Sequence, residues 1–139
     1  MTVRRFGQAL AAVAAGLALA GCAVAGVPQP TASSPVATPA LPPGGVFLAT
    51  LDFAYGPAGF SIPAVAKPVG WTDLSELVTV VFAPADGQVV HDYLVANLSG
   101  MGCPITSQSS DSIVWQCGNW GGGFTMTSSQ AALTLRKQT

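Results

Sequence analysis

The chain has 139 residues, of which half are apolar and only 8% are charged, and its formal net charge is −1. This length is enough for one domain. After residues 1–21, basic residues do not cluster beyond the pair Arg136-Lys137, so the sequence lacks the basic patch typical of a nucleic-acid-binding protein.

Residues 1–21 have the three parts of an export signal. Arg4 and Arg5 form a short positive segment, an Ala/Leu-rich stretch covers 9–20, and small residues then precede a cysteine. The 12 residues of this stretch would span about 18 Å as a helix, which is too short for a bilayer core of about 30 Å. We therefore predict a signal peptide over residues 1–21, with an ordinary secretory signal or an uncleaved anchor as the alternative.

The end of this segment, Leu19-Ala20-Gly21-Cys22, resembles the lipobox of bacterial lipoproteins. The resemblance implies that a diacylglycerol is transferred to the Cys22 thiol and that the chain is cut before this residue. Two or three acyl chains anchor a protein stably, so the resemblance implies an exported protein held by lipid on the outer face of the cell membrane. The pair Arg4-Arg5 also resembles a twin-arginine export signal, although Phe6-Gly7-Gln8 departs from that pattern, so both export routes stay open.

Residues 22–45 form the predicted lipid-anchored linker, which is rich in Pro, Ser and Thr. Its part after Cys22 contains six prolines and no charged residue. Proline fixes φ and removes a backbone donor, so this composition favours an extended tether with a reach of roughly 70 Å. The same composition is found in O-glycosylated stalks, so the tether is either unmodified or glycosylated.

A globular composition begins at Val46, and we predict one small domain over residues 46–139. Val46–Phe53 is predicted to be a strand or an extended segment. Ala54–Trp71 is predicted to be an irregular loop because it contains glycines and three prolines. Leu77–Phe82 is rich in β-branched residues and is predicted to be a strand.

One helix is predicted, over Gln88–Ser99, where apolar residues recur at helical spacing. Asp86 stands at the position of an N-cap, and Gly100 fits the position just beyond the helix. Four short strands are predicted to follow, separated by turn residues. They are Cys103–Gln108, Ser112–Gly118, Trp120–Thr127 and Ala131–Arg136. The predicted fold class is α+β, with the order β-α-β-β-β-β and the helix packed on an antiparallel sheet of about five strands.

A cysteine pair tests the register of the first predicted hairpin. A three-residue loop centred on Ser110 places apolar partners on one face and brings the two domain cysteines opposite each other. The pairs are Cys103 with Cys117, Ile105 with Trp115, and Ser107 with Ile113. In an oxidising exported compartment such a pair indicates a disulfide, with two buried thiols as the alternative.

The sequence predicts no metal and no cofactor. His91 is the only histidine, so the sequence gives little support to a metal site. Gly121-Gly122-Gly123 is unlike a phosphate-binding loop because a strand follows it and the Lys-Ser/Thr pair is missing. We interpret these glycines as a bulge, a sharp twist, or space for neighbouring tryptophan rings.

Tyr93–Leu135 resembles a pattern found in small actinobacterial, mycobacterial-type lipoproteins. The shared features are a helix that ends in Leu-x-x-x-Gly, a hairpin, a strand that contains Trp-Gly, and a final Leu-Thr-Leu strand. They stand here as Leu98-Ser99-Gly100-Met101-Gly102, Trp120-Gly121-Gly122 and Leu133-Thr134-Leu135. Where an aromatic residue commonly follows the glycine, this chain has Cys103. The resemblance implies a location in the cell envelope. It implies no activity, and it assigns no functional residue in this chain.

No residues are predicted to be catalytic. His91 is expected to be a half-exposed structural residue beside Asp92. The carboxylate pairs Asp73 with Glu76 and Asp86 with Asp92 are better explained by solubility and helix capping than by glycoside hydrolysis.

We therefore expect a non-enzymatic binding module of the cell envelope, whose partner is an envelope protein or a component of the cell wall. Its sheet or loops would make the contact. The aromatic residues of Phe53-Ala54-Tyr55-Gly56-Pro57 and Gly59-Phe60 are candidates, although core packing explains them equally well. The alternative is a carrier that holds a small apolar ligand between the helix and the sheet.

Overall fold

The computed structural model describes residues 39–139. Cys22, the signal peptide and most of the linker therefore lie outside the described residues. Within the described part of the chain, no helix is long and apolar enough to cross a membrane.

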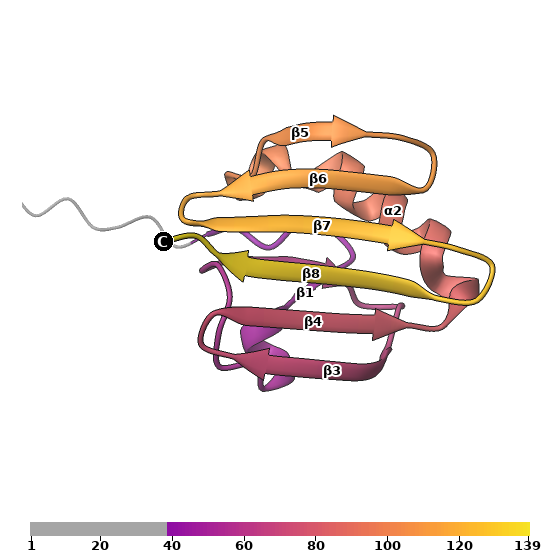
Figure 1. Cartoon of the computed structure of the whole chain (residues 1–139), viewed down its shortest axis with the longest axis horizontal. Helices are drawn as coiled ribbons and strands as arrows, with labels where there is room; N and C mark the ends of the chain where they lie inside the picture. Colours follow the sequence, from indigo (N-terminus) through magenta and orange to yellow (C-terminus); the bar gives the residue numbers. More distant parts are fainter. Residues whose placement is uncertain (1–38) are drawn as a thin grey trace, which may run out of the picture. The chain divides into compact units, whose positions relative to one another are not determined.

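A six-stranded antiparallel sheet is the main element of the domain (Figure 1). Its strands follow one another in the spatial order β3-β4-β8-β7-β6-β5. They are β3 (Pro68–Leu74), β4 (Leu77–Phe82), β5 (Ile105–Gln108), β6 (Ser112–Cys117), β7 (Trp120–Met126) and β8 (Ala131–Lys137). The last four strands run as a meander that returns β8 to the side of β4.

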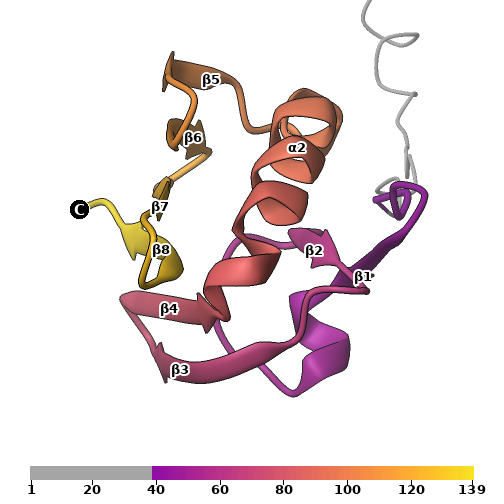
Figure 2. The ribbon, with the colours of Figure 1, turned by 90° about the vertical axis from the view of Figure 1, so that its right-hand side faces the viewer.

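The helix α2 (Gly87–Asn97) lies on one face of this sheet (Figure 2). A second, two-stranded sheet of β1 (Gly45–Phe47) and β2 (Ser61–Pro63) packs against α2. Three 3-10 turns complete the described elements: η1 (Leu48–Leu51), η2 (Pro84–Asp86) and η3 (Ser99–Met101). The predicted class, α+β with one helix on an antiparallel sheet, is thus confirmed for residues 39–139, whereas the count of about five strands is too low.

The core lies between α2 and the inner face of the sheet. Alternate residues of β4, β6, β7 and β8 point to this face and are buried. They meet the buried side of α2, and Phe60 stacks on Trp115 with ring centroids 5.9 Å apart. The largest fully buried side chains are Trp115, Phe60, Phe82, Phe124, Ile62, Leu94, Leu98, Ile113, Leu133, Leu135, Val78 and Val80.

Two predictions for the N-terminal half of the domain are wrong. Ala54–Trp71 is not wholly irregular, because it contains β2 and the first half of β3. Val46–Phe53 is extended only at its beginning and then turns into η1. Proline and glycine interrupt the polar-apolar alternation in both segments, and this interruption hid the strands from sequence reasoning.

The ends of the helix also differ in detail from the prediction. Asp86 stands at the N-cap position, but its side chain makes no capping hydrogen bond. The chain continues past α2 into η3, so the left-handed residue that ends the turn is Gly102, with φ 79°, and not Gly100.

The hairpin of β5 and β6 has one pair of the predicted register. Ile105 lies opposite Trp115 as predicted, but an irregularity at Thr106 then shifts Ser107 opposite Val114. The predicted partner of Ser107, Ile113, therefore faces Gln108 instead. The predicted three-residue loop is replaced by a tighter turn, which the Ser109 amide closes by donating to the Ser112 carbonyl at 2.8 Å. A bulge in the strand thus absorbs the residue that the prediction placed in the loop.

Candidate interaction surface

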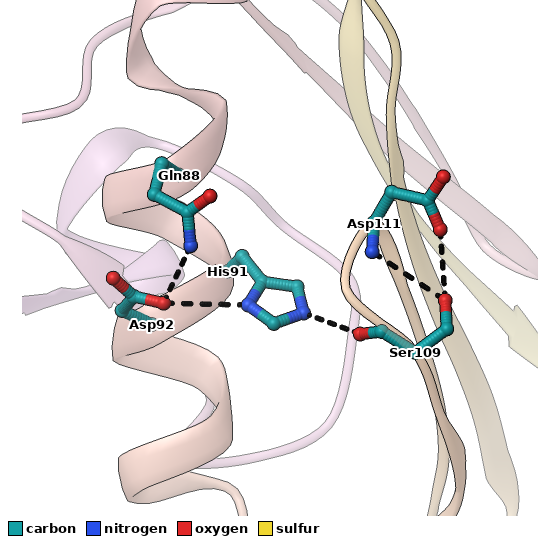
Figure 3. Close-up of polar contacts among 5 residues, drawn as sticks. All are labelled: Gln88, His91, Asp92, Ser109 and Asp111. Carbon is teal, nitrogen blue, oxygen red and sulfur yellow. Dashed lines mark hydrogen bonds and ion pairs between the residues drawn. The ribbon is translucent and has the colours of Figure 1, made fainter.

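The single histidine links α2 to the turn between β5 and β6 (Figure 3). His91 is buried, so the expectation of a half-exposed residue is wrong. Its Nε2 lies 2.9 Å from the Ser109 carbonyl oxygen, and its Nδ1 lies 3.4 Å from Oδ1 of Asp92. Gln88 donates to the same Asp92 oxygen at 2.7 Å.

This arrangement differs from a nucleophilic triad. A carbonyl oxygen only accepts, so Nε2 carries the hydrogen of that bond. The Ser109 hydroxyl donates instead to Oδ1 of Asp111, at 2.8 Å. The histidine therefore joins two elements of the fold, and its Nε2 offers no lone pair to a serine hydroxyl.

We expect His91→Ala to lower the free energy of unfolding by about 1–3 kcal/mol, because it removes a buried ring and its hydrogen bond. Urea unfolding monitored by tryptophan fluorescence measures the loss. Asp92→Ala is the matched control, since the Asp92 side chain is 68% exposed and such a surface change costs within about 0.5 kcal/mol. Equal losses for the two variants would contradict the proposed link.

The two domain cysteines are joined in the structure. Cys103 and Cys117 form a disulfide with Cα atoms 4.3 Å apart. Cys103 lies just before β5 and Cys117 ends β6, so the bond closes the open end of this hairpin. The pairing expected from the sequence is therefore present, although Cys103 lies outside the strand in which it was predicted.

The carboxylates do not gather into a site. Asp73 lies within β3, and its two oxygens accept hydrogen bonds from the Ala54 and Tyr55 amides at 2.6 and 3.2 Å. It therefore holds the loop after η1 against β3, a role that differs from the solubility expected from the sequence. Within residues 39–139, no three His, Cys, Asp or Glu side chains are grouped closely enough to hold a metal ion.

The loop aromatics that the sequence singled out have different environments. Phe53 and Phe60 are buried in the core, so core packing explains them. Tyr55 is 46% exposed and remains available for contact.

Exposed apolar side chains gather around β3. Five of the nine large apolar side chains that are exposed within residues 39–139 belong to β3 or to the segment 51–55. We call these five residues the edge patch: Leu51, Tyr55, Val69, Trp71 and Leu74. Sequence reasoning missed four of them, because β3 was predicted as a loop up to Trp71 and η1 as extended chain.

The edge patch has a physical origin in the position of β3. Trp71 lies opposite the buried Val80, so its side chain is on the same face of the sheet as the core. Figure 2 shows α2 beside β5 to β8, whereas η1 lies beside β3. Phe53 lies near the indole with its ring tilted by 59° and the ring centroids 6.4 Å apart, and Trp71 stays 64% exposed.

Two separate hollows lie beside members of the edge patch. One, of about 200 Å³, is lined by Leu51, Phe53, Pro68 and Trp71. Another contains Tyr55, Asp73 and Leu74 in its wall. Exposed apolar side chains therefore lie along β3 and in the segment beside it, and groups of this kind mark interaction sites.

A further apolar groove of about 400 Å³ lies next to the edge patch, between η1 and the segment 53–60. The chain itself fills part of it. Pro39 lies so close to Gly59 that a Cβ added there would come within 2.6 Å of the proline ring. Because the groove is partly occupied in this way, we consider the edge patch the stronger candidate for a partner.

Comparison with models of protein families, with curated proteins and with solved structures found no match to this chain.

Proposed function

We propose that this chain is a lipid-anchored lipoprotein of the cell envelope whose domain binds a partner without catalysing a reaction. In this proposal the thiol of Cys22 carries the lipid, and residues 22–45 tether the domain to the outer face of the cell membrane. The edge patch makes the contact. The observation that supports this binding role most directly is the exposure of five large apolar side chains on β3 and in the segment 51–55: Leu51, Tyr55, Val69, Trp71 and Leu74.

The partner of this proposal is a protein or another component of the envelope. Surface patches with a central aromatic residue are common where proteins meet, because a large flat ring provides much contact area at low entropy cost. Trp71 takes that role here. The net charge of −3 for residues 22–139, from three basic and six acidic residues, disfavours nucleic acid as the partner.

A carrier of a small apolar ligand is the second candidate, with the ligand between α2 and the sheet. That space is filled by fully buried side chains, among them Trp115, Phe124 and Leu133. A ligand would have to displace them from a close-packed core, which costs far more than binding at an exposed patch. We therefore favour the interaction module.

The anchor is tested by Cys22→Ser. We expect this variant to lose incorporation of labelled fatty acid completely and to leave the membrane fraction, because the thiol is the acceptor of the lipid. Metabolic labelling and fractionation measure both effects, and Cys103→Ser, which leaves Cys22 intact, is the control. Acylation that persists in Cys22→Ser would contradict the anchor.

The patch is tested by the double variant Trp71→Ser and Leu74→Ser. Both side chains are more than half exposed, so the free energy of unfolding should change by about 1 kcal/mol or less. The size of the complex extracted from the envelope in mild detergent should fall to that of the chain alone. Val114→Ser is the control, since Val114 is an exposed apolar residue on β6, away from the edge patch. A complex that keeps its size in the double variant would contradict the patch as the contact.

A further inference from the structure

The apolar groove next to the edge patch contains the first described residue of the chain. The groove has a volume of about 400 Å³ and lies between η1 and the segment 53–60. This volume is in the range of about 300–1,000 Å³ that is typical of ligand sites. None of the described residues that line the groove is charged. Burying a charge without a partner costs free energy, so the groove suits an uncharged, largely apolar occupant.

One proline ring already lies in the groove. Pro39 contacts Gly59 so closely that a Cβ added to Gly59 would lie 2.6 Å from Cβ and 2.7 Å from Cγ of the proline. Gly59 has φ 78°, a left-handed conformation that glycine adopts without strain. Because Gly59 has no side chain, the proline ring packs directly on the backbone. The groove therefore accepts proline.

Aromatic side chains form much of the wall of the groove. Phe53 and Phe60 are buried, Phe47 is half-buried, and Tyr55 is exposed. Grooves lined by aromatic residues bind proline-rich segments, because a polyproline II helix is stiff and has little conformational entropy to lose. Such a helix has no internal hydrogen bonds, so its carbonyl groups accept from outside. The hydroxyl of Tyr55 can donate to them.

The chain has a proline-rich segment directly before this groove. Residues 23–45 contain six prolines and no charged residue, and the described part of the chain begins at Pro39, within the groove. A polyproline II helix has three residues per turn. A segment that continues from Pro39 in this conformation presents Val36 on the same side as Pro39. The covalent connection gives a high effective concentration, so even a weak contact is populated.

We propose that residues 33–38 bind in the groove as a continuation of Pro39, with Val36 as the main contact. The linker then acts as a strap on the domain. Its free part comprises residues 23–32, and their reach is roughly 30 Å in place of roughly 70 Å for the whole linker. Docking of the strap therefore sets how far the domain extends from the lipid anchor.

The strap also affects the edge patch, an extension that rests on the proposed function. Tyr55 lines the groove and belongs to the edge patch. Phe53 lines both the groove and the hollow beside Trp71. A partner that covers Tyr55 competes with the strap for this ring. Binding of the partner then releases the strap and lengthens the tether, and the coupling is reciprocal.

The test is photo-crosslinking within the full chain in mild detergent. A small diazirine amino acid takes the place of Val36, and mass spectrometry locates the crosslinks after proteolysis. A matched chain has the same amino acid at Ala37, which a polyproline II conformation directs to a different side from Val36. Mixtures of isotopically labelled and unlabelled chains separate crosslinks within one chain from those between two chains.

We expect position 36 to crosslink to residues 47–60 of the same chain, with a yield at least about twofold above that from position 37. Tyr55→Ser should lower this yield at least about twofold, because it removes an aromatic wall of the groove. Pro35→Gly should lower it by a similar factor, because glycine loses more conformational entropy on docking. This second variant changes a residue outside the described domain, so the fold does not depend on it.

Several results would overturn the strap: no crosslink to residues 47–60, equal yields from positions 36 and 37, or a yield that either variant leaves unchanged. Crosslinks between labelled and unlabelled chains would assign the groove to a second copy and would also overturn it. These failures are distinguishable from failure of the proposed function. The crosslink is measured in the purified chain without a partner, whereas the size of the envelope complex tests Trp71 and Leu74, which do not line the groove.

Discussion

Gly122→Ala should lower the free energy of unfolding by about 3 kcal/mol, which corresponds to a fall in Tm of about 10 °C or more. A Cβ on Gly122 would lie 2.2 Å from Cε2 and Nε1 of the Trp115 indole. This ring is almost fully buried and is stacked on Phe60, so it has no free space into which to move. Interiors packed to this density respond to one extra methyl group with strain.

The neighbouring glycine provides the matched control. Gly123 lies on the opposite face of β7, and a Cβ there would meet only the Ile113 carbonyl oxygen at 3.8 Å. Gly123→Ala should therefore change the free energy of unfolding by about 0.5 kcal/mol or less. Thermal unfolding measures the stability of both variants. An equal loss of stability in Gly122→Ala and Gly123→Ala would show that the strand requires glycine for a reason other than contact with the indole.

A double-mutant cycle isolates the contact between Gly122 and the indole. In a background of Trp115→Leu, which removes the overlapping ring atoms, the additional cost of Gly122→Ala should fall below about 1 kcal/mol. An unchanged cost in that background would contradict a clash with Trp115.

Loss of the disulfide should have an effect of similar size. The bond between Cys103 and Cys117 spans a sequence separation of 14 residues, and in the chain-entropy model a loop of this length contributes about 3 kcal/mol. We expect the double variant Cys103→Ala and Cys117→Ala to lose about this amount in urea unfolding. Amide exchange should rise most in β5, because this edge strand has only four residues and one neighbouring strand.

A reducing agent provides the control for the disulfide. It should destabilise the natural chain by about the same amount and should leave the double variant unaffected. Destabilisation of both proteins by the reducing agent would mean that its effect does not act through this bond.

The part of the fold that sequence reasoning predicted best is the part with regular alternation. β4, β6, β7 and β8 were each found to within one or two residues, because buried and exposed positions alternate along them. The disulfide was predicted from an even pair of cysteines that face each other in the hairpin expected from Cys103–Gln108 and Ser112–Gly118, and the structure has this bond. The space for tryptophan rings, one of three interpretations of the glycines, is confirmed at Gly122, and β7 shows no register shift that would mark a bulge.

The part that was missed carries the candidate site. β3 contains Pro68 and Gly70 and exposes both of its faces in part, so its sequence has neither the alternation nor the continuous apolar run of a typical strand. The signal that could have revealed it is the pair Ser75-Glu76 between Leu74 and Leu77, which is a two-residue turn between apolar residues. The burial of His91 was missed for a different reason, since it depends on the β5–β6 turn that covers the helix.

The most direct test of the interaction module is site-specific crosslinking in the intact envelope. A photo-reactive amino acid takes the place of Trp71 in one full chain and of Val114 in another, and mass spectrometry identifies what each captures. We predict one defined envelope product from position 71 that is absent from position 114 and lost when Leu74 is replaced by Ser. Equal products from both positions, or no product from position 71 in a chain that is correctly localised, would contradict the account.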